Sequence, residues 1–140
     1  MSLKINKNAA KKGFLIFITP ILVAVMQCNK AKNCENVQCT EEYRSIMLHI
    51  QYPDGHPVSL DSNKVFWVSE NRYLIKQNYN SSYIIVDDGM KKELQNKKEV
   101  MRFIGYMEDK IVCERDVLVG ADCCHVDYYG TEPLTQTIQY

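Results

Sequence analysis

Hydrophobic and polar residues alternate along much of the chain, with the two-residue period of β-strands. The clearest run lies between residues 43 and 52, where one parity holds Ile46, Leu48, Ile50 and Tyr52 and the other holds Ser45, Met47, His49 and Gln51. Such alternation is typical of a strand with one face buried. Pro53-Asp54-Gly55 follows directly, and this sequence predicts a turn in which the glycine takes a positive φ.

Further strands are expected at short spacing, over residues 64–69, 73–76, 83–87, 100–107, 110–119, 125–129 and 135–140. Glu108-Asp109 lies between two of them and predicts a tight hairpin. Helical spacing occurs at 89–98, where Met90 and Leu94 are four residues apart and Glu93 precedes Lys97 by four. The pattern predicts an all-β fold. We expect a single antiparallel β-sandwich of about seven or eight strands, Ig-like or transthyretin-like, with one short surface helix.

The first residues have the layout of a secretory signal peptide. Four lysines precede an apolar run over residues 13–26, and Pro20 interrupts that run. A helix of this length reaches only about 21 Å, which is short of a hydrocarbon core of about 30 Å. The sequence therefore predicts a signal peptide over residues 1–27 rather than a permanent transmembrane anchor.

A cysteine closes the apolar run. Val25-Met26-Gln27-Cys28 resembles a bacterial lipobox, in which the cysteine is lipidated and becomes the mature N-terminus. Gln27 stands where most such motifs have a small residue, and this relaxed form resembles the lipoboxes of Bacteroidetes lipoproteins. The resemblance implies lipidation of Cys28 and a place in the cell envelope, on the inner or the outer membrane. Ordinary secretion with cleavage nearby is the alternative.

The mature chain divides into a polar tether at 28–38 and a domain at 39–140. The whole chain balances 17 basic against 17 acidic residues, but four lysines precede Cys28, which leaves 13 against 17 and a charge of about −4. This charge argues against nucleic acid as a partner and against electrostatic adhesion to anionic lipid. Membrane attachment would have to come from the lipid on Cys28.

Five cysteines remain after Cys28. Cys113 shares its strand parity with Ile111, Val117 and Val119, so we expect a free, buried thiol there. Export permits disulfides, and the candidates for two bridges are Cys34, Cys39, Cys123 and Cys124, with three possible connectivities. A bridge between the neighbours Cys123 and Cys124 needs a distorted peptide unit, so we expect Cys39 to bridge to one of these two.

Two clusters could carry chemistry. Asp122-Cys123-Cys124-His125 is a candidate metal or thiol-redox site, although no CxxC or HxxxH spacing supports zinc and neighbours on a strand point to opposite faces. A disulfide beside a hydrogen-bonded histidine is the expected arrangement. Asp87-Asp88-Gly89 could give oxygen ligands to Ca²⁺, with Asp122 or Asp127, or could cap a helix start.

The sequence predicts a protein that is not an enzyme. It contains no nucleophile elbow, HExxH motif or P-loop, and nothing in it calls for a cofactor or a resident metal. Two functions remain open. The favoured one is a non-catalytic binding or structural module at the envelope, with an unknown protein or glycan partner. The alternative is a metal-binding or thiol-redox envelope protein centred on residues 122–125.

Two stretches of the domain carry a further resemblance. Cys39-Thr40-Glu41-Glu42-Tyr43-Arg44 and the later run Val119-Gly120-Ala121-Asp122-Cys123-Cys124-His125-Val126 resemble the opening and closing motifs of small uncharacterised Bacteroidetes lipoproteins. The strand followed by Asp54-Gly55-His56-Pro57-Val58 is similar to carboxypeptidase-regulatory-like and transthyretin-like sandwiches. These resemblances imply a location and a fold, and they bring no activity with them.

Overall fold

The structure is a computed structural model that describes residues 33–74, 78–79 and 81–139. The predicted signal peptide and Cys28 lie outside the described residues. Within the described part, no helix is long and apolar enough to cross a membrane. The strands are β1 (Ser45–Gln51), β2 (Ser62–Trp67), β3 (Arg72–Leu74), β4 (Asn78–Tyr79), β5 (Ser82–Asp87), β6 (Lys98–Met107), β7 (Lys110–Ala121), β8 (Val126–Tyr128) and β9 (Thr135–Thr137), and the helical turns are η1 (Asp88–Met90) and α1 (Lys91–Leu94).

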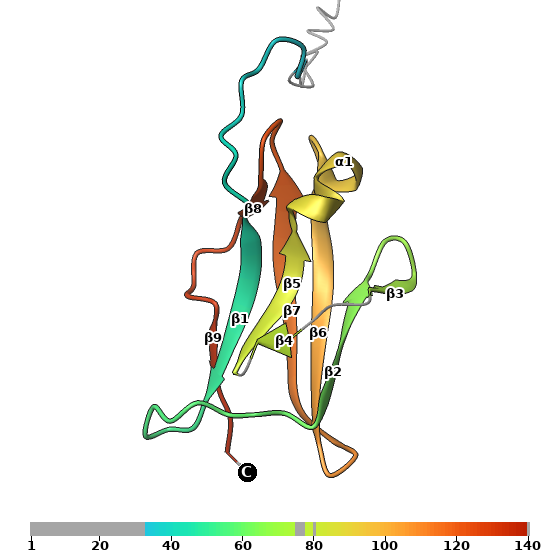
Figure 1. Ribbon diagram of the computed structural model, residues 1–140. Coiled ribbons are helices and arrows are strands. Elements are labelled where there is room, and N and C mark those ends of the chain that lie inside the picture. The colour runs from blue at the N-terminus through green and yellow to red at the C-terminus, as the bar shows by residue number, and fades with distance from the viewer. Residues whose placement is uncertain (1–32, 75–77, 80, 140) are drawn as a thin grey trace, which may run out of the picture.

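The strands form two sheets that pack face to face, as Figure 1 shows. One sheet has the order β4-β5-β1-β9 and the other β3-β2-β6-β7-β8. The predicted all-β sandwich with one short helical segment is confirmed. The nine strands of the described residues include β4, a two-residue strand that the sequence pattern did not predict.

The strand pairs are antiparallel, as expected, except at β9, which pairs with β1 in parallel. After β8 the chain leaves the five-stranded sheet and crosses to the other sheet, where it enters beside β1 and runs in the same direction (Figure 1). The backbone N–H of His49 donates to Leu134 O at 2.8 Å, and that of Ile138 donates to Gln51 O at 3.0 Å. A crossover between sheets needs no hairpin, so the parallel pairing is available to it.

Alternation of side chains supplies the core between the sheets. The largest fully buried side chains come from both layers: Trp67, Tyr83, Phe103, Leu48, Ile50, Ile85, Leu94, Met101, Val58, Val65, Val86 and Val117. The rings of Tyr83 and Phe103 meet across the layers with centroids 5.5 Å apart. The buried Tyr83 hydroxyl donates to Val58 O at 3.1 Å and accepts from Leu60 N at 2.7 Å, so its polar end is satisfied.

The predicted helix at 89–98 is wrong in its extent. Helical structure ends at Leu94, and β6 already begins at Lys98. Asn96 takes a φ of 58°, and its N–H donates to Ala121 O at 3.1 Å, which turns the chain into the sheet beside β7. Glu93 forms its ion pair with Arg72 rather than with Lys97, because the helix stops before the latter position.

The prediction that Ile111 shares the buried face of Cys113 was also wrong. Cys113, Val117 and Val119 are buried as expected, but Ile111 is 56% exposed. The register between β6 and β7 shifts by one residue there, since Gly105 pairs with Cys113 but Tyr106 pairs with Ile111. The extra residue, Val112, is a β-bulge, and a bulge reverses the parity of every residue beyond it.

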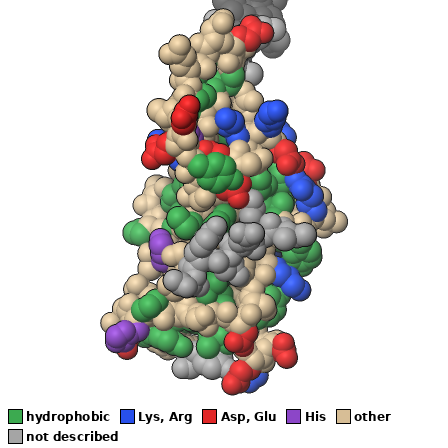
Figure 2. Space-filling view, in the orientation of Figure 1, with side chains coloured by type: hydrophobic (Ala, Val, Ile, Leu, Met, Phe, Trp, Pro, Cys, Tyr) green, Lys and Arg blue, Asp and Glu red, His purple; other side chains and the backbone are tan. Residues whose placement is uncertain are grey.

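The two predicted turns are confirmed. Gly55 has a φ of +85°, and its N–H donates to Tyr52 O at 2.9 Å. Glu108 and Asp109 connect β6 to β7 as a two-residue hairpin with φ values of 47° and 62°. On the face shown in Figure 2, Asp and Glu side chains gather at the two ends of the domain.

Candidate functional site

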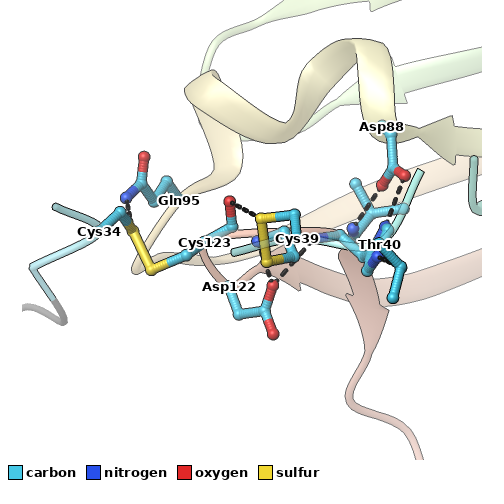
Figure 3. The surroundings of a disulfide bond; sticks show 10 residues. Cys34, Cys39, Thr40, Asp88, Gln95, Asp122 and Cys123 are labelled. Carbon is cyan, nitrogen blue, oxygen red and sulfur yellow. Dashed lines mark hydrogen bonds and ion pairs between the residues drawn. A yellow bond between two sulfur atoms is a disulfide. The ribbon is translucent and has the colours of Figure 1, made fainter. Parts of the chain in front are cut away.

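Two disulfides join the N-terminal arm, residues 33–44, to the turn between β7 and β8. Cys34 is bonded to Cys123 and Cys39 to Cys124, with Cα–Cα distances of 5.3 and 5.2 Å. Disulfide bonds were expected, and of the three connectivities this one has each arm cysteine bonded to one of the adjacent pair. Figure 3 shows the two bridges side by side, with Gln95 from the end of α1 donating to the Cys34 sulfur. The predicted tether at 28–38 is therefore held to the domain at Cys34.

Asp122 shapes the turn that carries the adjacent cysteines. Its carboxylate accepts from the backbone N–H of Cys124 at 2.6 Å and from that of His125 at 2.8 Å. Its own N–H donates to His125 O at 3.1 Å. This local ring of hydrogen bonds is typical of an aspartate that starts a turn. It fixes the backbone so that Cys123 and Cys124 reach two different points of the arm.

His125 connects three segments that are distant in sequence. Its ring Nδ1 lies 2.8 Å from Asp88 Oδ2, and its Nε2 lies 3.0 Å from Thr40 Oγ1. The residue is only 7% exposed, whereas Thr40 lies on the exposed arm. Both ring nitrogens therefore have partners, as a buried histidine requires. The chain of hydrogen bonds ties the arm and η1 to the start of β8.

The Asp88 carboxylate has three hydrogen-bond partners. Besides His125, it accepts from Arg44 N at 2.9 Å and Val126 N at 2.8 Å. Burial raises the pKa of the Asp88 carboxyl, but these hydrogen bonds and the nearby His125 outweigh burial, so its pKa lies below the usual value. The carboxylate form is the one that the fold holds. A further link comes from Asp88 N, which donates to Arg44 O at 3.0 Å.

The order carboxylate, histidine and hydroxyl is also that of acyl-transfer sites. Such a site needs backbone N–H donors aimed at the reacting oxygen beside the hydroxyl. Here the N–H groups of Cys124 and His125 in the adjoining turn donate to Asp122. The arrangement positions Thr40 and the arm, and we interpret the cluster as a structural junction.

Asp87, Asp88 and Asp122, three of the candidate calcium ligands, have other roles. Asp87 caps η1, because its side chain accepts from Gly89 N at 2.9 Å. Asp88 belongs to the junction with His125, and Asp122 to the turn. Among the described residues, no group of three or more His, Cys, Asp or Glu side chains is arranged to hold a metal ion.

The remaining candidates are separated in space. In the described part of the chain Cys113 is the free cysteine; it is buried, and burial raises its pKa to about 11, which keeps the thiol protonated. Cys123 and Cys124 are both in disulfides, so neither offers a thiolate to zinc. His49 is exposed beside Ser82 Oγ at 2.9 Å, and His56 is exposed in the turn after β1.

An open groove of about 660 Å³ lies on another side of the domain, between β7 and the chain that runs from β8 to β9. Arg115 lines it, and its guanidinium donates to Pro133 O at 2.9 Å and to Thr135 O at 2.7 Å. These bonds hold the crossover chain against β7. The groove is lined mostly by polar atoms.

Sequence reasoning missed Thr40 and the pairing of Asp88 with His125. Asp88 and His125 were singled out for separate reasons, and nothing in their spacing of 37 residues links them. Neither a protein-family model nor a curated protein nor a solved structure matches this chain.

Proposed function

We propose that the protein is exported, anchored in the cell envelope by lipid on Cys28, and serves there as a non-catalytic binding or structural module. The lysine-rich start, the short apolar run and the cysteine that closes it support export and lipidation. The resemblance to Bacteroidetes lipoproteins supports the same location. The partner on the module is a protein or a glycan.

The observation that carries the proposal is the pair of disulfides at the N-terminal end of the domain. Disulfides form and persist in oxidising compartments and are rare in the bacterial cytoplasm. Two bridges also connect the domain directly to the segment that follows Cys28. A module on a lipid anchor gains from this attachment, because disulfides hold the segment after the anchor against the domain.

A thiol-redox or metal function at residues 122–125 is less well supported. A redox site needs an exposed thiolate of low pKa, and the free thiol of the described residues is buried with a raised pKa. A zinc site needs free thiolates, whereas both cysteines at 123 and 124 are bonded. His125 has hydrogen-bond partners on both ring nitrogens.

Intact-mass analysis of the full chain, produced in a bacterial host with an envelope, tests the anchor. We expect a mature protein that begins at Cys28 and carries the mass of a diacylglyceryl group and an amide-linked chain. Cys28→Ser should remain unprocessed, whereas the control Cys113→Ser should be lipidated like the wild type. An intact Met1 or an unlipidated terminus elsewhere contradicts the anchor.

Metal analysis and thiol counting on the purified, denatured protein separate the two functions. The binding module predicts one reactive thiol, that of Cys113, and no stoichiometric zinc or copper. Zinc or copper bound in proportion to protein, and lost in His125→Ala, would favour the metal function instead.

A further inference from the structure

The outer face of the five-stranded sheet has an unusual composition. We define this face by the outward side chains of its strands, which are Lys64 and Phe66 of β2, Tyr73 of β3, Arg102, Ile104 and Tyr106 of β6, and Ile111, Glu114 and Asp116 of β7. Tyr73 is 59% exposed and Ile111 is 56% exposed. Exposed apolar side chains that are grouped on one face often mark an interaction surface.

The aromatic residues of the outer face are packed together rather than scattered. The rings of Phe66 and Tyr73 have centroids 5.0 Å apart at an angle of 54°. The Lys64 ammonium lies 5.7 Å from the Tyr73 ring centroid and 5.4 Å from that of Tyr106. Aromatic side chains such as those of Phe66, Tyr73 and Tyr106 are enriched at protein interfaces.

One cation and one anion of the outer face lie at the same level on either side of β6. The register places Lys64, Ile104 and Glu114 opposite one another on three neighbouring strands, so a cation and an anion flank a central apolar residue. Lys64 and Glu114 are both exposed. Neighbouring strands lie about 4.8 Å apart, so the two charges sit at equal distances on either side of Ile104.

We propose that the partner of the outer face is a second copy of this chain, packed face to face about a two-fold axis that runs along β6 at Ile104. Such an axis exchanges left and right across the sheet. It therefore places Ile104 on Ile104 of the second copy, and Lys64 of each copy on Glu114 of the other. A face with its cation and its anion at matching distances from the axis is complementary to itself, as an isologous interface requires.

Arg102 also lies on β6 and would meet its own counterpart. Its guanidinium is already neutralised within the chain, because it donates to Asp116 at 2.7 and 2.9 Å and lies 3.4 Å from Glu114. Aligned sheets cross at about 30°, so the closest contacts gather around the crossing point at Ile104. The face measures roughly 20 by 30 Å from strand spacing and rise, which places the dimer at the weak end of specific interfaces. The dimer does not depend on the lipid anchor.

Charge reversal on the full chain, purified in mild detergent and studied by native mass spectrometry from 1 to 100 μM, tests the proposal. We expect wild-type dimers in this range, and at least tenfold weaker dimers for Lys64→Glu and for Glu114→Lys, because each places two like-charged pairs across the axis. The double variant should dimerise within about threefold of the wild type. An equimolar mixture of the two single variants should form heterodimers. A monomeric wild type, or a double variant no better than the singles, overturns the proposal.

A cysteine placed on the axis gives a second test. Ile104→Cys should form a disulfide with its own copy under mild oxidation, since a residue on a two-fold axis meets itself. Tyr73→Cys, on the outermost strand β3 and more exposed to oxidant than position 104, is the control and should not do so. Equal cross-linking of both variants overturns the two-fold arrangement. A monomer that instead binds a glycan or another protein, and loses that binding in Tyr73→Ser, also overturns the second copy as the occupant.

Discussion

The two ends of the sandwich are held together in different ways. At the arm end, the N-terminal arm meets η1, α1 and the turn at residues 122–125, and the two bridges span sequence separations of 89 and 85 residues. At the opposite end lie the turn at 53–56 and the hairpin at Glu108 and Asp109 (Figure 1). Each of these two turns needs only a few consecutive residues to form, although the hairpin also bonds to Asp61, whereas the arm end forms only when distant segments have already come together.

This difference shows which end of the molecule depends on the whole fold for its stability. The arm end combines disulfides with a buried chain of Asp88, His125 and Thr40, so damage at one member leaves other polar groups unsatisfied. The hairpin end has two residues with positive φ, and the strain there is confined to the turn itself. Substitutions at the arm end should therefore lower the unfolding free energy strongly and non-additively. Substitutions at the opposite end should change it only slightly and independently of one another.

The largest effect should come from removing both bridges together. Each bridge alone closes nearly the same long loop, so removing one, as Cys34→Ser with Cys123→Ser, releases only the small loop between the two bridges. That loss should be about 2 kcal/mol of unfolding free energy. Replacing all four cysteines also releases the long loop and should cost roughly 6 kcal/mol. Thermal and urea unfolding measure both losses. Two pairwise losses that simply add up to the fourfold loss would show that the two bridges do not close the same long loop.

A smaller loss is expected from Asp88→Ala. The substitution leaves the backbone N–H groups of Arg44 and Val126 and the ring of His125 without their acceptor, which should cost about 3 kcal/mol. The neighbouring Asp87→Ala removes the cap of η1 and the hydrogen bond with the Tyr43 side chain; it is the matched control, at about 1 kcal/mol. Urea unfolding at pH 7 compares the two variants. Equal losses would contradict the central role of Asp88 in the junction.

The same carboxyl predicts a pH dependence. The pKa of Asp88 is lowered in the folded protein, so its contribution to stability is complete above the unfolded value of about 3.9 and is lost as the pH falls through the folded pKa. The gap in unfolding free energy between wild type and Asp88→Ala should hold from pH 7 to about 5 and narrow below about 4. If this difference in unfolding free energy widened in acid, the folded protein would favour the protonated form of Asp88 instead.

The smallest effect, and the only gain, is expected at the hairpin. Glu108 and Asp109 both have positive φ, a conformation that asparagine and glycine adopt at lower cost. The double change Glu108→Asn with Asp109→Gly should raise the unfolding free energy by about 1 kcal/mol. The backbone N–H of residue 108 can still donate to Asp61 Oδ2. A loss measured by urea unfolding would show that the two native side chains stabilise this turn.

The alternation of side chains predicted much of the fold. It found β1 with Leu48 and Ile50 facing the core, and the residue types at 53–55 found the turn at Gly55, because both features depend on neighbours in sequence. The prediction failed where contacts with a distant segment determine the local structure. The bulge at Val112 is set by the register against β6, and no pattern within β7 records it. The helix likewise stopped early because Asn96 bonds to Ala121, a distant residue.

Of the candidate site, the sequence predicted the participants better than their arrangement. Cysteine count and the buried position of Cys113 singled out the four bonded cysteines, but the choice between connectivities depends on how the arm lies over the turn. Thr40 was overlooked because a threonine beside a cysteine carries no signal of its own. Its role comes from facing the Nε2 atom of His125 across 85 residues of chain.

The bridge at Cys34 also limits the distance between Cys28 and the domain. If Cys28 carries lipid as proposed, five residues separate it from Cys34, the first residue with a disulfide to the domain, and the six residue steps span about 21 Å at most. The arm end would then stay close to the bilayer, and the long axes of both sheets would tend to stand away from it. In that posture the outer face of the five-stranded sheet points sideways, toward other molecules anchored in the same leaflet, where confinement to a surface raises the effective concentration of a weak partner.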